Sequence, residues 1–192
     1  MRNPDRIVSS EGEQLILVDR EDNVIGFSSK ADCHDGDGVL HRAFSVFLFD
    51  AEGRLLIQQR AAGKRLWPGY WSNTCCSHPR RGEALDVATS RRLEDELNIS
   101  AKLEFVYRFI YQARYGVEGS EHELCHVFLG RLTDEPRPNV SEIAALRRVR
   151  SMDLDAELDA SPETFTPWFR LEWNALKESH AARLSAYASP NR

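Results

Sequence analysis

Three histidines and two glutamates are the residues of this chain whose types and spacing could best carry out chemistry. His34, His41 and His78 precede Glu121 and Glu123, which stand two positions apart. On a strand, residues two apart point to the same face, so the two carboxylates are expected side by side. Like charges this close repel each other unless a cation or a proton intervenes. The pattern therefore favours a bound divalent metal, a raised pKa, or both.

The donor types narrow the choice of metal. Imidazole suits Zn, Fe, Ni and Mn, and two carboxylates shift the preference toward a harder ion such as Mn²⁺. Each residue also has an ordinary structural interpretation. His34 and His41 could be polar residues of a loop and a strand start, and the two glutamates could form a solvated edge with His122 and Leu124 turned inward.

A second reactive stretch is WSNTCCSHPRRGE, residues 71–83, in which Cys75 and Cys76 are adjacent and His78 follows. The chain has no C-x-x-C pair, which argues against a cysteine-only zinc site or a thioredoxin-type redox pair. Neighbouring cysteines do not easily form a relaxed disulfide, so free thiols are expected. Cys76 can be interpreted as a small buried apolar residue or as a reactive thiol.

Composition limits the classes of partner. The chain has 192 residues, 42% of them hydrophobic, and a net charge of -5. The charge gives no general reason to expect nucleic acid or an anionic membrane as partner. No apolar run reaches the roughly 18–20 residues of a membrane span, and the start lacks a signal-peptide pattern. We therefore expect a cytoplasmic protein, a monomer or weak homo-oligomer, with neither nucleic acid nor membrane as partner.

One domain is expected over residues 1–192, with its core at about 13–185. The apolar periodicity predicts a mixed α/β (α+β) order, in which strands dominate and helices lie between and after them. The predicted segments are a hairpin over 13–30, a loop or frayed helix over 30–41, a hairpin over 42–60, a helix over 83–98, strands over 103–116, 121–132 and 142–150, and a C-terminal helix over 165–187. Basic residues cluster near 60–65, 80–81 and 91–92, which leaves room for a small anionic ligand.

Several of these segments together resemble one family. The pieces KADCHDGDGVLHRAFSVFLFD, LLIQQRAAGKRLWPGYWSNTCCSHPRRGE, RRLEDELNI, YQARYGVEGSEHELCHVF and FTPWF occur in this order. They resemble the type I isopentenyl-diphosphate isomerases, which belong to the Nudix-fold superfamily. The resemblance implies a Nudix-like mixed β-sheet sandwich flanked by helices, with an N-terminal hairpin and a C-terminal helix. It also implies interconversion of isopentenyl and dimethylallyl diphosphate through a tertiary carbocation, in isoprenoid biosynthesis.

The resemblance also implies roles for single residues. Cys76 and Glu123 would transfer protons on opposite sides of the substrate, Tyr111 would assist Glu123, and the Trp168 indole would face the developing positive charge. One divalent metal, Mn²⁺ or Zn²⁺, would be held by the histidine–glutamate set, namely His34, His41, His78, Glu121 and Glu123.

The remaining implied roles concern the diphosphate. Glu96 would be the protein ligand of a Mg²⁺ that also binds the substrate diphosphate, which fits the few carboxylates that Mg²⁺ normally takes. The basic side chains that would neutralise the diphosphate are Lys30, Arg60, Lys64 and Arg92. Arg65, Arg80 and Arg81 are interpreted as surface residues.

One departure from the superfamily's hydrolytic motif matters for the chemistry. Nudix hydrolases carry an Arg-Glu pair where this chain has Arg91 and Arg92, so a carboxylate is replaced by a guanidinium. This makes hydrolysis of a diphosphate less expected, and the arginine suits binding of an intact one. The alternatives are a Nudix hydrolase acting on a nucleoside diphosphate derivative and a catalytically silent module that binds diphosphate or senses metal.

Overall fold

The computed structural model describes residues 6–190; the outermost residues of the expected domain over 1–192 lie outside this range. Strand β3 (His41–Phe49) runs through the middle of the molecule and is almost entirely buried. Its side chains alternate between two hydrophobic clusters. Val46 and its even-numbered neighbours pack against helix α2 (Leu85–Leu97), whereas Phe47 and its odd-numbered neighbours face helix α4 (Pro167–Ser179).

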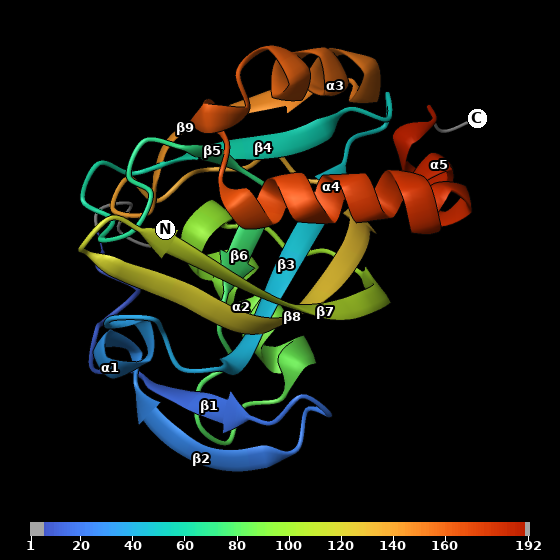
Figure 1. The fold of residues 1–192 in the computed structure, drawn as a ribbon. Helices are drawn as coiled ribbons and strands as arrows, with labels where there is room; N and C mark the ends of the chain where they lie inside the picture. The colour runs from blue at the N-terminus through green and yellow to red at the C-terminus, as the bar shows by residue number, and fades with distance from the viewer. Residues whose placement is uncertain (1–5, 191–192) are drawn as a thin grey trace.

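The other strands are arranged around β3 in one mixed sheet (Figure 1). β3 pairs antiparallel with β1 (Gln14–Val18), β4 (Leu55–Arg60) and β6 (Cys75–Ser77), and parallel with β8 (Gly119–Arg131). Further out, β2 (Val24–Ser29) pairs with β1, β5 (Trp71–Ser72) and β9 (Ile143–Val149) pair with β4, and β7 (Leu103–Tyr115) pairs with β8. This is the predicted mixed sheet with flanking helices.

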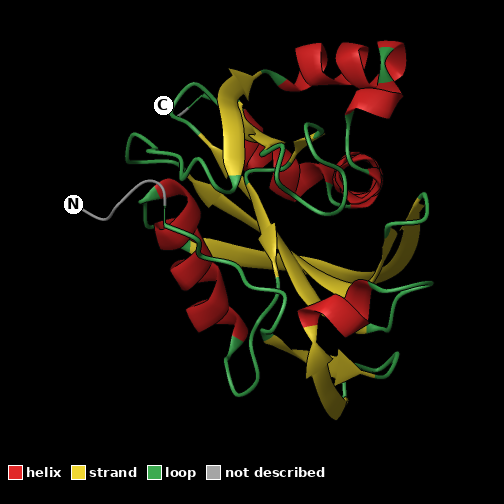
Figure 2. Cartoon of the chain, turned by 90° about the vertical axis from the view of Figure 1, so that its left-hand side faces the viewer, coloured by secondary structure: helices red, strands yellow, loops and turns green. Residues whose placement is uncertain are grey.

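Helices cover both sides of this sheet, as Figure 2 shows. Helix α5 (Ala181–Ala188) continues from α4 on one side, and α2 lies against the other. Short helix α1 (Lys30–His34) connects β2 to β3, while α3 (Ser151–Ala160) and a 3₁₀ turn (Pro162–Thr164) lead from β9 to α4. Within residues 6–190, no helix is both long and apolar enough to cross a bilayer.

Most predicted elements are present, and the exceptions are informative. The hairpin over 13–30, the helix over 83–98 and the strands over 103–116, 121–132 and 142–150 are confirmed. The expected hairpin over 42–60 is confirmed at its turn, where β3 and β4 pair antiparallel, but this pairing is limited to Phe49 and Leu55. The C-terminal helix is broken at His180, whose backbone is not helical, and α3 was not predicted.

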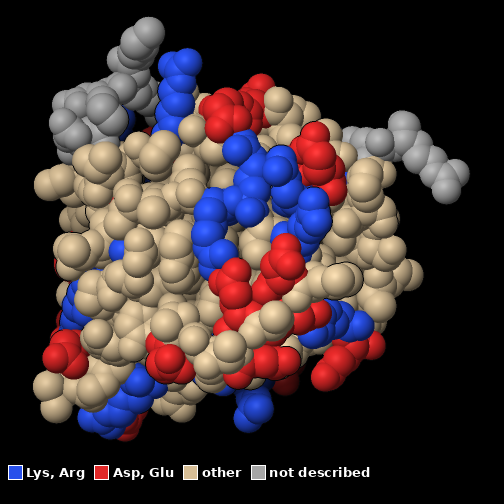
Figure 3. Space-filling view, turned by 90° about the horizontal axis from the view of Figure 1, so that it is seen from above, with Lys and Arg blue, Asp and Glu red and all other residues tan. Residues whose placement is uncertain are grey.

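Charged side chains on the face seen from above are of both signs and lie close together (Figure 3). Ion pairs include Lys177 of α4 with Asp155 of α3 at 2.7 Å and Arg148 of β9 with Glu135 at 2.6 Å. A surface of such mixed charge lacks an extended region of positive potential. A nucleic-acid-binding surface typically has one, formed by a stripe of basic side chains.

The start of β8 lies directly against the end of α1. Gly119 has a φ of +143°, and a Cβ at this position would lie 2.2 Å from the carbonyl oxygen of His34. Ser120 Oγ donates to the carbonyl oxygen of Gly36 at 2.7 Å. A glycine is thus required where β8 approaches the segment that carries His34.

We expect Gly119→Ala to lower the free energy of unfolding by about 2 kcal/mol or more, because the added methyl group collides with backbone and the φ is unfavourable. Urea unfolding would measure this. Gly63→Ala is the matched control, since a Cβ there meets no atom within 4 Å; it should change stability by no more than about 0.5 kcal/mol. An unchanged unfolding midpoint for Gly119→Ala would contradict the close contact of β8 with α1.

Candidate active site

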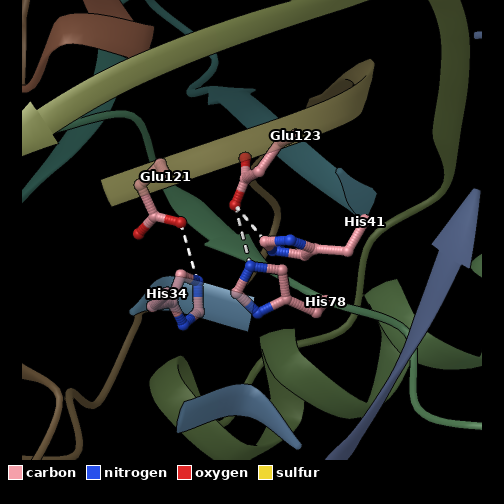
Figure 4. A group of neighbouring side chains, drawn as sticks. All are labelled: His34, His41, His78, Glu121 and Glu123. Atoms are coloured by element: carbon pink, nitrogen blue, oxygen red, sulfur yellow. Dashed lines mark hydrogen bonds and ion pairs between the residues drawn. The ribbon is translucent and has the colours of Figure 1, made fainter. Parts of the chain in front are cut away.

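The five histidine and glutamate side chains singled out in the sequence converge on one point (Figure 4). His34 ends α1, His41 begins β3, and His78 follows β6. Glu121 and Glu123 point from the same face of β8, and Glu123 lies opposite His41 in the parallel β3–β8 register. One potential ligand atom from each of the five lies within 4.8 Å of all the others.

The polar atoms of this histidine–glutamate cluster lie close together, but not all of them form hydrogen bonds. His78 Nε2 lies 2.8 Å from Glu123 Oε1, and His41 Nε2 lies 3.8 Å from the same oxygen. His34 Nε2 lies 2.8 Å from Glu121 Oε2, yet neither atom has a partner in hydrogen-bond geometry. Nε2 of His41 is likewise buried without a hydrogen bond.

Burial keeps two of these imidazoles neutral. It lowers the pKa of His41 to about 4 and the pKa of His78 well below its usual value. The Nδ1 of His41 lies 2.7 Å from the carbonyl oxygen of Val39, so that nitrogen carries the proton and the Nε2 lone pair faces the cluster. These are the tautomer and the charge state that metal ligation requires.

The cluster fits a divalent metal ion. Buried polar atoms without partners are costly, and here two imidazole nitrogens and one carboxylate oxygen remain without partners among the described residues. Burial, and then the neighbouring Glu121, raise the pKa of Glu123 well above its usual range. A cation among three nitrogen and two carboxylate donors would satisfy these atoms and relieve the repulsion between the carboxylates.

The two adjacent cysteines face opposite sides of the sheet because they lie on strand β6. Cys75 is buried in the cluster packed against α2, whereas Cys76 is half-buried and borders the cluster packed against α4. Cys76 pairs with Ser45 of β3. Burial raises the pKa of its thiol to about 12, although the Arg60 guanidinium, 3.9 Å from the sulfur, opposes this effect. All four cysteines are free, and Cys76 carries its proton at neutral pH.

Glu123 has a second neighbour in Tyr111. The Tyr111 hydroxyl donates to Glu123 Oε2 at 2.7 Å, and the two residues are paired across β7 and β8. Burial, and then Glu123, raise the pKa of Tyr111 well above its usual value, so the phenol remains protonated. Glu123 therefore contacts the histidine–glutamate cluster with one carboxylate oxygen and a proton donor with the other.

Trp168 is held in place by packing and by one hydrogen bond. Its indole Nε1 donates to Ser72 Oγ at 3.1 Å, and its ring meets Trp67 edge to face with centroids 5.3 Å apart. The Arg60 guanidinium lies 5.3 Å from the Trp168 ring centroid. Arg60 also donates to the carbonyl oxygens of Trp67 and Leu66. The indole is thus rigid and already has a cation over it.

These groups border a cavity of about 390 Å³, a volume that suits a small ligand. Its lining includes most residues singled out in the sequence: Lys30, His34, Arg60, Lys64, Cys76, His78, Arg92, Tyr111, Glu121, Glu123 and Trp168. His41 lies beneath it, fully buried against Glu123. Glu96 does not line it, because its carboxylate is buried and accepts from Arg92 Nε at 2.9 Å.

Positive charge is concentrated on the part of this cavity formed by Lys30, Lys64 and Arg92. Burial, and then the charge of Lys64, lower the pKa of Lys30. The Arg92 guanidinium is only 2% exposed and also donates to the carbonyl oxygen of Val8 at 3.0 Å. Such a group of cations in a concave, partly buried site attracts a small anion.

Sequence reasoning assigned no role to Trp67, Ser72 and Glu142, which also contribute to the site. Trp67 has a positive φ of 46°, and its place before Pro68 and Gly69 was a signal that this turn is special. The Ser72 hydroxyl accepts from Trp168 and also contacts the side chains of Asn73 and Thr166. Glu142 contacts both Lys64 and Arg92, but nothing in its local sequence distinguishes it from a surface glutamate.

Solved structures share the arrangement of the strands and helices. DR0079 from Deinococcus radiodurans matches with a TM-score of 0.64 at 22% identity, covering 77% of this chain and 90% of that one. A MutT protein from Methanosarcina mazei matches with a TM-score of 0.61 at 15% identity, covering 73% of this chain and 95% of that one. At these identities, the likeness concerns the fold alone.

Sequence comparison is more specific. Residues 39–169 match the model of the NUDIX domain. A protein of Photorhabdus laumondii, Isopentenyl-diphosphate Delta-isomerase 1, is 42% identical over 90% of this chain and 99% of its own length. The Isopentenyl-diphosphate Delta-isomerase of Nocardia farcinica is 46% identical over 79% of this chain and 87% of its own length. With the convergent histidine–glutamate cluster and the cationic cavity beside it, these matches show that the chain belongs to the isopentenyl-diphosphate Delta-isomerase family of NUDIX-domain proteins.

Proposed function

We propose that this protein interconverts isopentenyl diphosphate and dimethylallyl diphosphate, and so acts in isoprenoid biosynthesis. One observation carries the proposal. A protonated thiol, a carboxylate bonded to a phenol, a buried indole and a group of cations all border the same cavity. Diphosphate binding by itself needs only the cations, whereas moving a double bond needs the other groups as well.

The reaction requires two proton transfers. A proton is added to the terminal CH₂ carbon of the alkene, which leaves a tertiary carbocation, and a proton is then removed from the neighbouring carbon on the diphosphate side. An unactivated alkene is a very weak base, so the donor must be well placed and water must be kept out. The protonated Cys76 thiol and the Glu123–Tyr111 pair are suited to these steps on opposite sides of the substrate.

Trp168 is the group best suited to the carbocation. An indole face attracts a cation by about 2 kcal/mol when the site is dry. The Arg60 guanidinium lies 5.3 Å from the centroid of this ring, so the indole already contacts one positive charge. The bond to Ser72 and the contact with Trp67 hold the ring still while charge develops.

The metal-binding residues would act on Glu123. A divalent metal held by His34, His41, His78, Glu121 and Glu123 would favour the ionised form of Glu123 and so adjust its ability to take and return a proton. We infer Mn²⁺ or Zn²⁺ from the donor types. Lys30, Arg60, Lys64 and Arg92 would bind the diphosphate, and Glu96, beside Arg92, is our candidate protein ligand for a Mg²⁺ that accompanies it.

The rival functions fit the site less well. In a Nudix hydrolase, carboxylates on the helix equivalent to α2 position metals and activate water, but here Arg92 takes one of those places and is bonded to Glu96. A silent binding module would have no use for a protonated thiol and a carboxylate bonded to a phenol that border the same cavity. Cytoplasmic location and a monomeric or weakly associated state remain predictions.

The direct test is incubation with isopentenyl diphosphate and Mg²⁺ in deuterated water, followed by NMR. We expect dimethylallyl diphosphate with deuterium in a methyl group, because the added proton comes from solvent by way of the site. Cys76→Ala should reduce the rate by about 10²–10⁴-fold, as loss of a general acid does. The control is Cys75→Ala, since that thiol faces α2. Unchanged substrate from folded wild-type protein would refute the proposed activity.

For Trp168, we expect Phe to slow turnover less than Ala does. Phe keeps an aromatic face toward the carbocation, whereas Ala removes both the face and the packing against Trp67. The turnover number of each variant, with stability measured in parallel, separates the two effects. If Phe and Ala slow turnover equally at equal stability, Trp168 serves only to pack.

Metal binding can be tested without activity. Adding Mn²⁺ or Zn²⁺ to chelator-treated protein should raise the thermal unfolding midpoint, since a ligand at a hundred times its Kd stabilises by about 2.7 kcal/mol. His41→Ala should abolish most of this shift. His126→Gln is the control, because His126 is buried but bonded to Asp22 outside the cluster. If the shift persists in His41→Ala, the metal binds elsewhere.

A further inference from the structure

Glu142 occupies a position in the cavity for which the proposed reaction has no use. It lies just before β9, its side chain is only 4% exposed, and its carboxylate borders the cavity. One oxygen, Oε2, accepts from Lys64 Nζ in a short contact and lies 3.3 Å from Arg92 Nη2. Two of the cations expected to bind a diphosphate are therefore already paired with one buried carboxylate.

Backbone hydrogen bonds hold the segments that carry this pairing side by side. The amide of Ala61 donates to the carbonyl oxygen of Glu142 at 2.9 Å, which joins the loop that carries Lys64 to the segment that carries Glu142. The amide of Glu142 in turn donates to the carbonyl oxygen of Asn139 at 3.0 Å. The backbone of Glu142 is therefore held beside the loop that carries its partner Lys64.

The ionised state of Glu142 depends on its partners. Burial opposes ionisation, but the charges of Lys64 and Arg92 hold the pKa of Glu142 below its usual value. Arg92 is also bonded to Glu96, so two carboxylates flank one guanidinium. The balance of charge in this part of the cavity is therefore set before any ligand enters.

An entering anion disturbs that balance. An anion that draws Lys64 and Arg92 toward itself weakens their contacts with Glu142 and leaves a buried carboxylate short of positive charge, which is strongly unfavourable. An anion that enters with a divalent cation brings the positive charge that Glu142 loses. Glu142 should therefore weaken the binding of free anions more than the binding of metal-bound anions. The site would gain specificity because the wrong ligand makes an unfavourable contact.

We propose that Glu142 makes diphosphate binding depend on Mg²⁺, and so favours metal-bound diphosphate over free anions such as inorganic phosphate. This inference rests on the proposed function, because it concerns the same diphosphate site. Glu142 is a positioning and specificity residue in this scheme, and it takes no part in the proton transfers. Because coupling between two ligands is reciprocal, diphosphate should equally strengthen the binding of Mg²⁺.

The test is calorimetric titration with inorganic pyrophosphate, in chelator-treated solution and again with Mg²⁺. We expect Mg²⁺ to tighten pyrophosphate binding to the wild-type protein by about tenfold or more, within the usual range of coupling between ligands. Glu142→Gln should reduce this enhancement by about fivefold or more, chiefly because metal-free pyrophosphate binds more tightly once the carboxylate is gone. Inorganic phosphate should also bind Glu142→Gln more tightly than it binds the wild type.

Two further variants make the outcome decisive. Glu142→Asp keeps the charge and should keep most of the Mg²⁺ enhancement, which separates charge from packing. Glu157→Gln is the matched control, because Glu157 pairs with Arg147 on the surface and is 38% exposed there. Mg²⁺ should tighten pyrophosphate binding to Glu157→Gln by as much as it does for the wild type.

If Mg²⁺ tightens pyrophosphate binding equally in the wild type and in Glu142→Gln, the proposed role of Glu142 is wrong. The role is also wrong if Glu142→Gln weakens pyrophosphate binding equally with and without Mg²⁺, because a residue with only a structural role would give that result. Failure of the wild-type protein to bind pyrophosphate in either solution would instead overturn the proposed diphosphate site, and this inference with it.

Discussion

The pairing of β3 with its neighbours is the constraint on which the rest of the structure depends. β3 is buried on both faces, and its register sets His41 opposite Glu123 on β8 and Ser45 opposite Cys76 on β6. A shift of one residue in either pairing would turn the reactive side chains to the α2 side of the sheet, because strand side chains alternate. The candidate proton-transfer groups are thus positioned by strands in a packed core. Such positions are more precise than positions on loops.

The histidine–glutamate cluster contributes little to stability by itself. Buried imidazole nitrogens without partners and two neighbouring carboxylates are unfavourable, and the surrounding sheet must hold them together. The close approach of β8 to α1 at Gly119 is part of that support, since it sets His34 beside Glu121. A cation in the cluster would turn an unfavourable arrangement into a favourable one. The stability of the fold and the binding of a metal are therefore linked at this cluster.

Local patterns in the sequence predicted those structural features that depend on residues close together in the chain. The helix over 83–98 followed from its apolar spacing, and the common face of Glu121 and Glu123 followed from strand alternation. The parallel pairing of β3 with β8 joins residues about eighty positions apart, and no local pattern reveals it. The chain therefore looked like a simple hairpin over 42–60. Glu142 was missed for the same reason, because its importance arises only where Lys64 and Arg92 meet it.

The environment of Arg92 supports the proposal that this fold binds a diphosphate without cleaving it. A guanidinium, which cannot hold a metal or activate water, lies in α2 where hydrolases of the superfamily have a carboxylate, and it is enclosed between Glu96 and Glu142. The two carboxylates hold the guanidinium in one orientation and limit the excess positive charge around it. In the proposed function, the diphosphate would be bound through charge and hydrogen bonds, and the reacting carbons would lie near Cys76, Glu123 and Trp168. On this proposal, a buried arginine in place of a metal-binding carboxylate would anchor the diphosphate and would leave the proton transfers to Cys76 and Glu123.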